Sequence, residues 1–351
     1  MPLSPTRSPL SSTITRGFTL IEVLVVMSII VVLAGILLVA LGSATETAKR
    51  AKSTTGLNSF RAACDAFALD HNTYPGVLPA TALDGYQLTS TQNALLHLMG
   101  GYRVCNDQSP ASEIAACDAY ESDSLNEGHT VVPIRDLVDP ATGLTWTLIV
   151  VPTRMGEGPV INNKPYSPYY APKESELAFN VIGADDYASG LNRIPNLVDA
   201  WGTPVIYMRR ERTVGPMMAS DTESGMFSVN GQQLYLASER LGELGHSQLL
   251  TPGPGSRLAF TAAGGSEPEP TDEQLRWLTL LLSHPSFYDP DVPEYGTPRS
   301  AYVVLSAGED GVYMARNDGP VNSSGAFDYD YEAATHEDLS DFDDIVLYGG
   351  G

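Results

Sequence analysis

Cysteines and basic residues are scarce in this sequence of 351 residues. Lysine and arginine together number 20 against 42 aspartates and glutamates, which gives a formal net charge of −22 at pH 7. So acidic a surface would repel phosphate groups, and this disfavours nucleic acid and anionic lipid as the main partner. The same surface favours solubility and divalent cations, although an acidic surface without any bound ion is equally compatible with the composition.

The three cysteines are Cys64, Cys105 and Cys117, and they form no CxxC or Cys/His spacing of the kind that binds zinc. Cys105 and Cys117 bracket a short polar loop, so they could pair if this part of the chain lies outside the cytoplasm. Three separate thiols are the alternative, and the sequence leaves both open.

Motifs of the common enzyme classes are also missing. The six histidines are scattered without an HExxH pair, and neither a GxSxG elbow nor a Walker GxxxxGK[ST] loop occurs. Pairs of carboxylates are so frequent in this chain that any catalytic pair chosen from them would be arbitrary. We therefore expect that the protein is not an enzyme.

A long apolar run occupies residues 18–41, in which only Thr19, Glu22 and Ser28 are polar. A helix of about 24 residues can cross a bilayer core of about 30 Å. An unpaired Glu22 would cost on the order of 2–4 kcal/mol in lipid, so it is a candidate functional residue. The run is too long for a secretory signal peptide and no small-x-small cleavage site follows it. An ordinary anchor that is never cut is the competing interpretation.

The start of this run resembles the class III leader of type IV pilins and type II secretion pseudopilins. The residues that carry the resemblance are Arg16-Gly17-Phe18-Thr19-Leu20-Ile21-Glu22, followed by Val23, Leu24, Val25 and Val26. The resemblance implies that a prepilin peptidase cuts after Gly17 and methylates the new amino terminus at Phe18. It also implies that Glu22 pairs with the terminal amine of a neighbouring subunit, and that residues 1–17 stay on the cytoplasmic side.

The helix is expected to continue beyond the membrane to about Leu69. No proline interrupts residues 44–70, and one apolar stripe is formed by Leu57, Phe60, Cys64 and Phe67. Residues 63–75, 196–208 and 301–313 then resemble, in order, the helix end, the Trp-Gly turn and the last strands of the major pseudopilin. The expected fold class is α+β, with a long amino-terminal helix packed on a carboxy-terminal antiparallel sheet.

Four parts follow from this interpretation: a leader (1–17), a membrane half of the helix (18–41), a soluble half (42–75) and an extracytoplasmic globular domain (76–351). The domain is much larger than that of small pseudopilins, because of insertions at about 76–195 and 209–300. Within these insertions we expect helices at 92–99 and 272–283, and strands at 145–151 and 234–236.

Carboxylates crowd the last 45 residues of the chain. Calcium takes six to eight hard oxygen ligands, which clustered aspartates and backbone carbonyls supply. In major pseudopilins the corresponding loop binds calcium, and the best matches here are Asp310, Asp341 and Asp343. The loop is longer than the family pattern and spaced differently. An acidic tail without an ion is the alternative.

The sequence thus predicts a structural subunit of a type II secretion pseudopilus or a type IV pilus-like filament. Its expected partners are further copies of itself, the prepilin peptidase, the inner-membrane assembly machinery and minor pilin-like subunits, but no nucleic acid. It would be a single-pass protein of the cytoplasmic membrane before assembly. Two alternatives remain: a minor or adhesive pilin, and a membrane-tethered extracytoplasmic domain that binds a ligand or acts as an enzyme.

Overall fold

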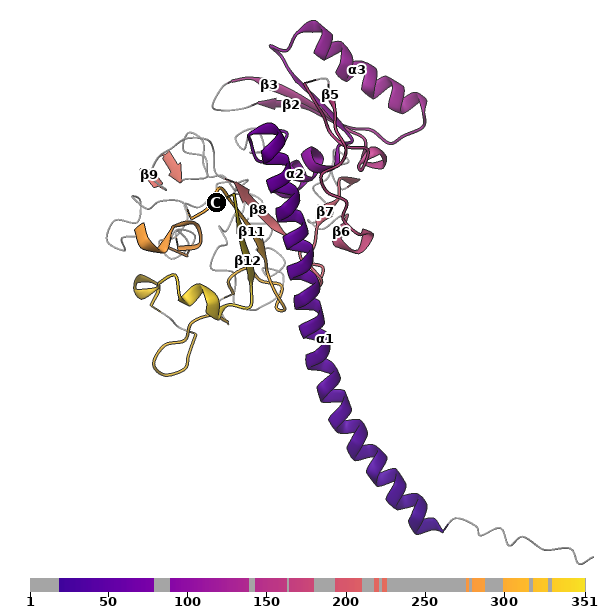
Figure 1. Ribbon diagram of the computed structural model, residues 1–351, viewed down its shortest axis with the longest axis vertical. Coiled ribbons are helices and arrows are strands. Elements are labelled where there is room, and N and C mark those ends of the chain that lie inside the picture. Colours follow the sequence, from indigo (N-terminus) through magenta and orange to yellow (C-terminus); the bar gives the residue numbers. More distant parts are fainter. Residues whose placement is uncertain are drawn as a thin grey trace, which may run out of the picture. The chain divides into compact units, whose positions relative to one another are not determined.

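The computed structural model divides the chain into two units, Met1–Ala48 and Lys49–Gly351. It describes residues 19–78, 89–138, 143–162, 164–179, 193–209, 218–220, 223–225, 276–277, 280–287, 299–315, 318–327 and 330–350. The helices are α1 (Leu20–His71), α2 (Ser90–Met99) and α3 (Ala111–Asn126) (Figure 1). The strands are β1 (Tyr102–Asn106), β2 (Val132–Val138), β3 (Thr145–Val150), β4 (Val160–Ile161), β5 (Lys164–Pro165), β6 (Leu177–Ala178), β7 (Asn196–Leu197), β8 (Ile206–Arg209), β9 (Met218–Ser220), β10 (Glu223–Gly225), β11 (Tyr302–Ser306) and β12 (Ile345–Gly349).

The first unit consists, in its described part, of the apolar half of α1. This helix is long and apolar enough to cross a membrane, and its most apolar 18-residue window has a mean hydropathy of 3.2 with none of its residues buried. Side chains such as Leu20 and Leu38 are 83% and 71% exposed. An apolar surface of this size is stable in lipid or against other apolar helices, but not in water.

In the second unit, the rest of α1 packs on a three-stranded antiparallel sheet of order β12-β11-β8. The apolar stripe expected from the sequence is the surface that makes this contact, because Phe60, Cys64 and Phe67 are each at most 1% exposed. The Phe60 ring lies edge-on to Tyr207 of β8, with 5.6 Å between the ring centroids. The helix ends at His71, where Asn72 adopts a left-handed φ of 59°.

The central strand β11 is buried on both faces. Tyr302 and Val304 face the cluster that contains α1, whereas Val303 and Leu305 face a second cluster built around Trp277. The side-chain alternation of a strand produces these two layers, one on each side of the sheet. The chain is therefore α+β with antiparallel sheets, as expected from the sequence.

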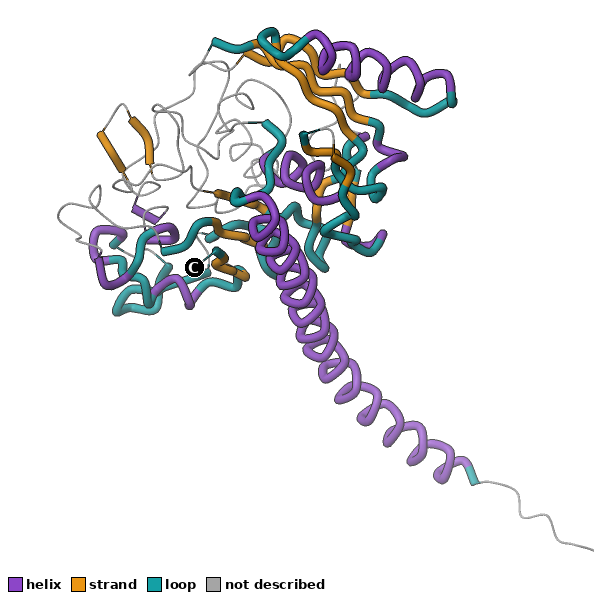
Figure 2. Tube along the Cα trace, turned by 45° about the horizontal axis from the view of Figure 1, so that its top comes forward, coloured by secondary structure: helices purple, strands orange, loops and turns teal. Residues whose placement is uncertain are grey.

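The first insertion contains a second sheet of order β1-β3-β2, also antiparallel. One face of it buries Leu148 and Val150 in one apolar cluster, and the other face carries Ile149 and Val151 against Tyr120 of α3. Figure 2 shows α3 lying alongside the strands of this sheet. This small α/β layer follows α2 in the chain, and Leu96 of α2 packs in the same apolar cluster as Leu148 and Val150.

Two of the four elements expected in the insertions are confirmed in full. The 92–99 helix corresponds to α2, which begins with a capping box between Thr89 and Gln92, and the 145–151 strand corresponds to β3. In the 272–283 segment, the described residues 276–277 and 280–282 are helical. The 234–236 strand lies outside the described residues.

A pH-dependent stability follows from His97 of α2. Its ring stacks on Phe67 at 4.9 Å between centroids, and its Nδ1 accepts a hydrogen bond of 2.9 Å from the backbone N–H of Gly76. Burial lowers the pKa of His97 to about 3, so the folded state keeps it neutral while the unfolded chain takes up a proton below about pH 6.5.

We therefore expect His97 to reduce the free energy of unfolding as the pH falls below 6.5. At pH 5 this contribution amounts to about 2 kcal/mol, since each pH unit of difference is worth about 1.4 kcal/mol. Urea unfolding of the wild type and of His97→Asn, each measured at pH 8 and pH 5, isolates the effect. Equal losses in the two proteins would contradict this assignment.

Candidate functional site

Helix α1 begins with a capping box formed by Thr19 and Glu22. The Glu22 carboxylate accepts hydrogen bonds from the backbone N–H and the hydroxyl of Thr19, at 2.8 Å and 2.7 Å. The Glu22 N–H in turn approaches the Thr19 hydroxyl oxygen at 3.3 Å. The carboxylate is thus held at the positive end of the helix dipole, in its first turn.

Sequence reasoning missed this local role of Glu22, although its signal is present. Thr19-Leu20-Ile21-Glu22 fits the [ST]-x-x-E spacing that marks a helix start. The two other residues expected at this end, Gly17 and Phe18, lie outside the described residues. Within its own chain, Glu22 therefore contacts Thr19. Any pairing of Glu22 with a neighbouring subunit would have to replace these hydrogen bonds or form beside them.

The turn after β11 brings the carboxy-terminal carboxylates together. Gly308 has a φ of 71°, and a Cβ added there would lie 2.6 Å from the Asp343 carbonyl oxygen. Only glycine fits this close approach without strain. It lets one carboxylate oxygen of Asp343, Oδ2, accept the N–H groups of Glu309 and Asp310 at 2.6 Å and 3.0 Å.

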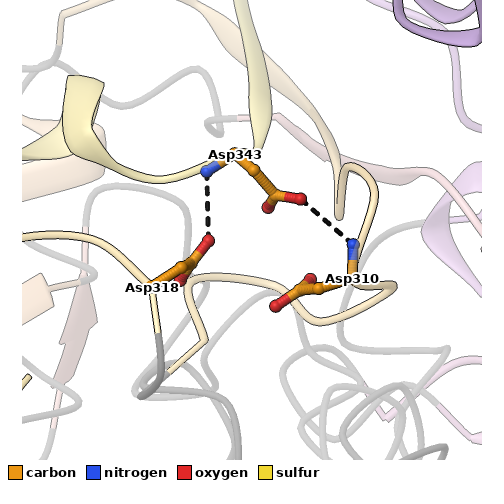
Figure 3. Close-up of side chains that lie close together, drawn as sticks. All are labelled: Asp310, Asp318 and Asp343. Carbon is orange, nitrogen blue, oxygen red and sulfur yellow. Dashed lines mark hydrogen bonds between the residues drawn. The ribbon is translucent and has the colours of Figure 1, made fainter. Parts of the chain in front are cut away.

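Asp318 completes a group of three carboxylates. Its Oδ2 accepts the backbone N–H of Asp343 at 3.1 Å, and one oxygen each from Asp310, Asp318 and Asp343 lie within 4.8 Å of one another (Figure 3). Asp344 is buried beside them and uses Oδ2 to accept the N–H of Met314 at 2.9 Å. Hard oxygen atoms at this separation form a donor set for calcium or magnesium.

Burial and nearby carboxylates disfavour the charged form of Asp310 and Asp344. Partial burial, together with the charges of Asp343 and Asp318, raises the pKa of Asp310 to about 7 against the opposing effect of the Val312 N–H. Burial likewise raises the pKa of Asp344 well above its usual range. The other oxygens of Asp343 and Asp344 (Oδ1) are buried without a hydrogen-bond partner, a situation that a cation would relieve.

Two of the three metal ligands expected from the sequence belong to this group. The third member, Asp318, was not among the expected ligands. Asp310 and Asp343 are members, whereas Asp341 ends the short 3₁₀ helix η9 (Asp338–Asp341), is exposed and is not one of the three. Asp318 takes its place. No local pattern marks Asp318, because it is 25 residues away from Asp343 in the chain and their approach depends on the path of the segment between them.

Asp199, in the Trp-Gly turn, has a structural role, as the sequence indicated. Its Oδ1 accepts the N–H groups of Trp201 and Thr203, both at 2.9 Å, and its Oδ2 accepts the Ser306 hydroxyl at 2.8 Å. The carboxylate therefore shapes its own turn and ties that turn to the end of β11, beside the carboxylate group.

These features define a class of protein. A single amino-terminal helix has an exposed apolar half and an amphipathic half that packs on an antiparallel sheet, and its first turn holds a glutamate. This is a type IV pilin-like architecture.

Comparison with known proteins narrows the class. Residues 14–38 match the family model described as the prokaryotic N-terminal methylation motif. A stretch of 60 residues is 42% identical to the type II secretion system core protein G of Pectobacterium carotovorum subsp. carotovorum. That stretch spans 17% of this chain and 38% of the relative. No solved structure matches the chain. The chain is thus pilin-like and similar to a type II secretion protein over 60 of its residues.

Proposed function

We propose that this protein is a structural subunit of a type II secretion pseudopilus or of a closely related pilus-like filament, without catalytic activity of its own. The observation that carries the proposal is the methylation motif of residues 14–38, which is continuous with the exposed apolar half of α1. The relative is named as a core protein of a secretion system, which supports a structural role.

In this proposal a prepilin peptidase removes residues 1–17 and methylates Phe18. Residues 18–41 then anchor the subunit in the cytoplasmic membrane, with residues 42–75 and the domain 76–351 on the outer side. During assembly the membrane half leaves the lipid and packs against the same segment of other subunits. Minor pilin-like subunits and the inner-membrane assembly machinery are its further partners.

Glu22 is proposed to guide this assembly. Cleavage after Gly17 creates a positive amine at Phe18, and Glu22 follows one helical turn later. In lipid or in a filament core, an isolated carboxylate is costly, whereas a carboxylate paired with the amine of a neighbour is compensated. The pair would set the axial position of each new subunit relative to the previous one.

The test separates this pairing from the capping role of Glu22. We expect Glu22→Gln, which keeps an acceptor for Thr19 but removes the charge, to reduce incorporation into filaments at least about tenfold, a loss equivalent to about 1.4 kcal/mol. Thr19→Ala is the matched control, because it weakens the cap and leaves the charge. Sheared filaments and membrane fractions are compared by immunoblot. Wild-type incorporation of Glu22→Gln would mean that capping alone explains this residue.

We also propose that Asp310, Asp318 and Asp343 bind calcium. Three carboxylates that converge within 4.8 Å, together with the buried unpaired oxygens of Asp343 and Asp344, support a divalent cation with a preference for hard oxygen ligands. Such an ion would join the turn after β11 to the chain that enters β12. It would thereby order the carboxy-terminal end of the domain.

A further inference from the structure

Cys105 and Cys117 lie in the same buried interface, between sheet β1-β3-β2 and helix α3. Both side chains are buried, at 7% and 3% exposure, and both are thiols in this structure. The third cysteine, Cys64, belongs to the separate cluster around α1. The interface between β1 and α3 therefore holds two of the three thiols of the chain.

The register of the two elements places these thiols opposite each other. Arg103 and Cys105 share one face of β1, since they are two residues apart on a strand. Cys117 and Tyr120 share one face of α3, since they are three residues apart on a helix. The Arg103 guanidinium lies over the Tyr120 ring at 4.6 Å, so the next positions on the two faces, Cys105 and Cys117, are brought into contact.

The two thiols also interact directly. Burial and, after it, a hydrogen bond with the Cys105 side chain raise the pKa of Cys117 to about 12.

Helix α3 buries few of its side chains, and its other contacts include an ion pair of 2.6 Å between Glu121 and Arg135 of β2. Only Cys117, Tyr120 and Ser124 of its 16 residues are buried, and the Ser124 hydroxyl has no hydrogen-bond partner. A narrow apolar stripe of this kind leaves a helix prone to local opening. A covalent link at Cys117 would limit that opening.

We propose that Cys105 and Cys117 form a disulfide that ties α3 to the sheet once the domain lies in an oxidising compartment. That the domain reaches an oxidising compartment rests on the proposed function, whereas the choice of Cys105 and Cys117 as partners rests on their geometry. The two thiols release two protons and two electrons. The electrons pass to the disulfide of an oxidising protein. One thiol first forms a mixed disulfide with that protein. The second thiol then breaks the mixed S–S bond, which forms the Cys105–Cys117 bond and leaves the oxidising protein as a dithiol.

The full chain is purified from cells in detergent, denatured, alkylated without reduction and examined by mass spectrometry. We expect a single alkylated cysteine, Cys64, and a peptide pair joined between Cys105 and Cys117. In Cys105→Ser, the thiol of Cys117 should become alkylated, and the reverse should hold for Cys117→Ser. A second sample is unfolded in urea and refolded with oxidised glutathione, which makes the pairing independent of the compartment.

Three alkylated thiols in both samples, or a bond that includes Cys64, would overturn the disulfide. Thiols that are free in cells but pair on refolding would support the geometry and contradict the proposed location. A functional readout comes from limited proteolysis of residues 107–131. Dithiothreitol should increase cleavage about tenfold in the wild type and leave the Cys105→Ser/Cys117→Ser protein unchanged. No increase in the wild type would show that the bond does not hold α3.

Discussion

Replacing Gly17 by alanine is expected to abolish both maturation and filament assembly. The proposed cut lies between Gly17 and Phe18, so a side chain at the first position would obstruct the peptidase. Without the cut, the chain keeps residues 1–17 and no free amine forms at Phe18. Glu22 then lacks its proposed partner. Mass spectrometry of the amino terminus measures the cut, and sheared-filament immunoblots measure the assembly.

Gly42→Ala is the matched control for this experiment. Gly42 lies within α1, and a Cβ added there would meet nothing within 4 Å, so alanine should strengthen the helix by about 1 kcal/mol and leave maturation intact. If Gly17→Ala were still cut and assembled, the proposed processing would be wrong. An uncut chain that entered filaments at the wild-type level would show instead that the amine of Phe18 is dispensable.

Calcium is expected to raise the melting midpoint of the full chain in detergent by about 5 °C. A ligand that binds only the folded state, at a hundred times its dissociation constant, contributes about 2.7 kcal/mol, and one kcal/mol corresponds to about 2 °C for a unit of this size. The physical reason is that the ion neutralises carboxylates whose mutual repulsion the fold otherwise has to oppose. Scanning calorimetry with calcium or with a chelator measures the shift.

Two single variants decide which aspartates bind the ion. Asp318→Asn should remove most of the calcium-dependent shift, because Asp318 lies in the carboxylate group. Asp341→Asn should retain the shift, because Asp341 ends η9 outside the group. The opposite outcome would favour the ligand set expected from the sequence. A wild-type protein that melts at the same temperature with and without calcium would exclude the site altogether.

Local signals account for the parts of the fold that the sequence predicted well. The stripe of Leu57, Phe60, Cys64 and Phe67 identified the buried face of α1, because a helix places residues three and four apart on one side. The helix end was placed to within two residues, since Pro75 disfavours helix in the residue before it. The strand and turn from Tyr302 to Gly311 were expected from the resemblance of residues 301–313 to the major pseudopilin, and β11 (Tyr302–Ser306) occupies that position.

Local sequence signals predict the Thr19–Glu22 helix start but not the membership of the carboxylate group. Thr19 and Glu22 are three residues apart, and a capping box of that spacing can be found by inspection of the sequence. Asp318 and Asp343 are 25 residues apart in the chain, and the resemblance to the calcium-binding loop of major pseudopilins suggested Asp341 as the ligand instead. The structure does not place Asp341 in the group, because this residue ends η9 and is exposed.

The sequence by itself determined the long apolar helix, its methylation motif and the face that its second half buries, since each depends on spacing within a few helical turns, and the resemblance it carries indicated the α+β class. Only the tertiary structure decided which carboxylates converge beside Gly308, and that Cys105 faces Cys117 across the α3 interface. These juxtapositions depend on the paths of loops and the docking of whole elements. Those are set by the sum of many weak contacts rather than by any periodic pattern.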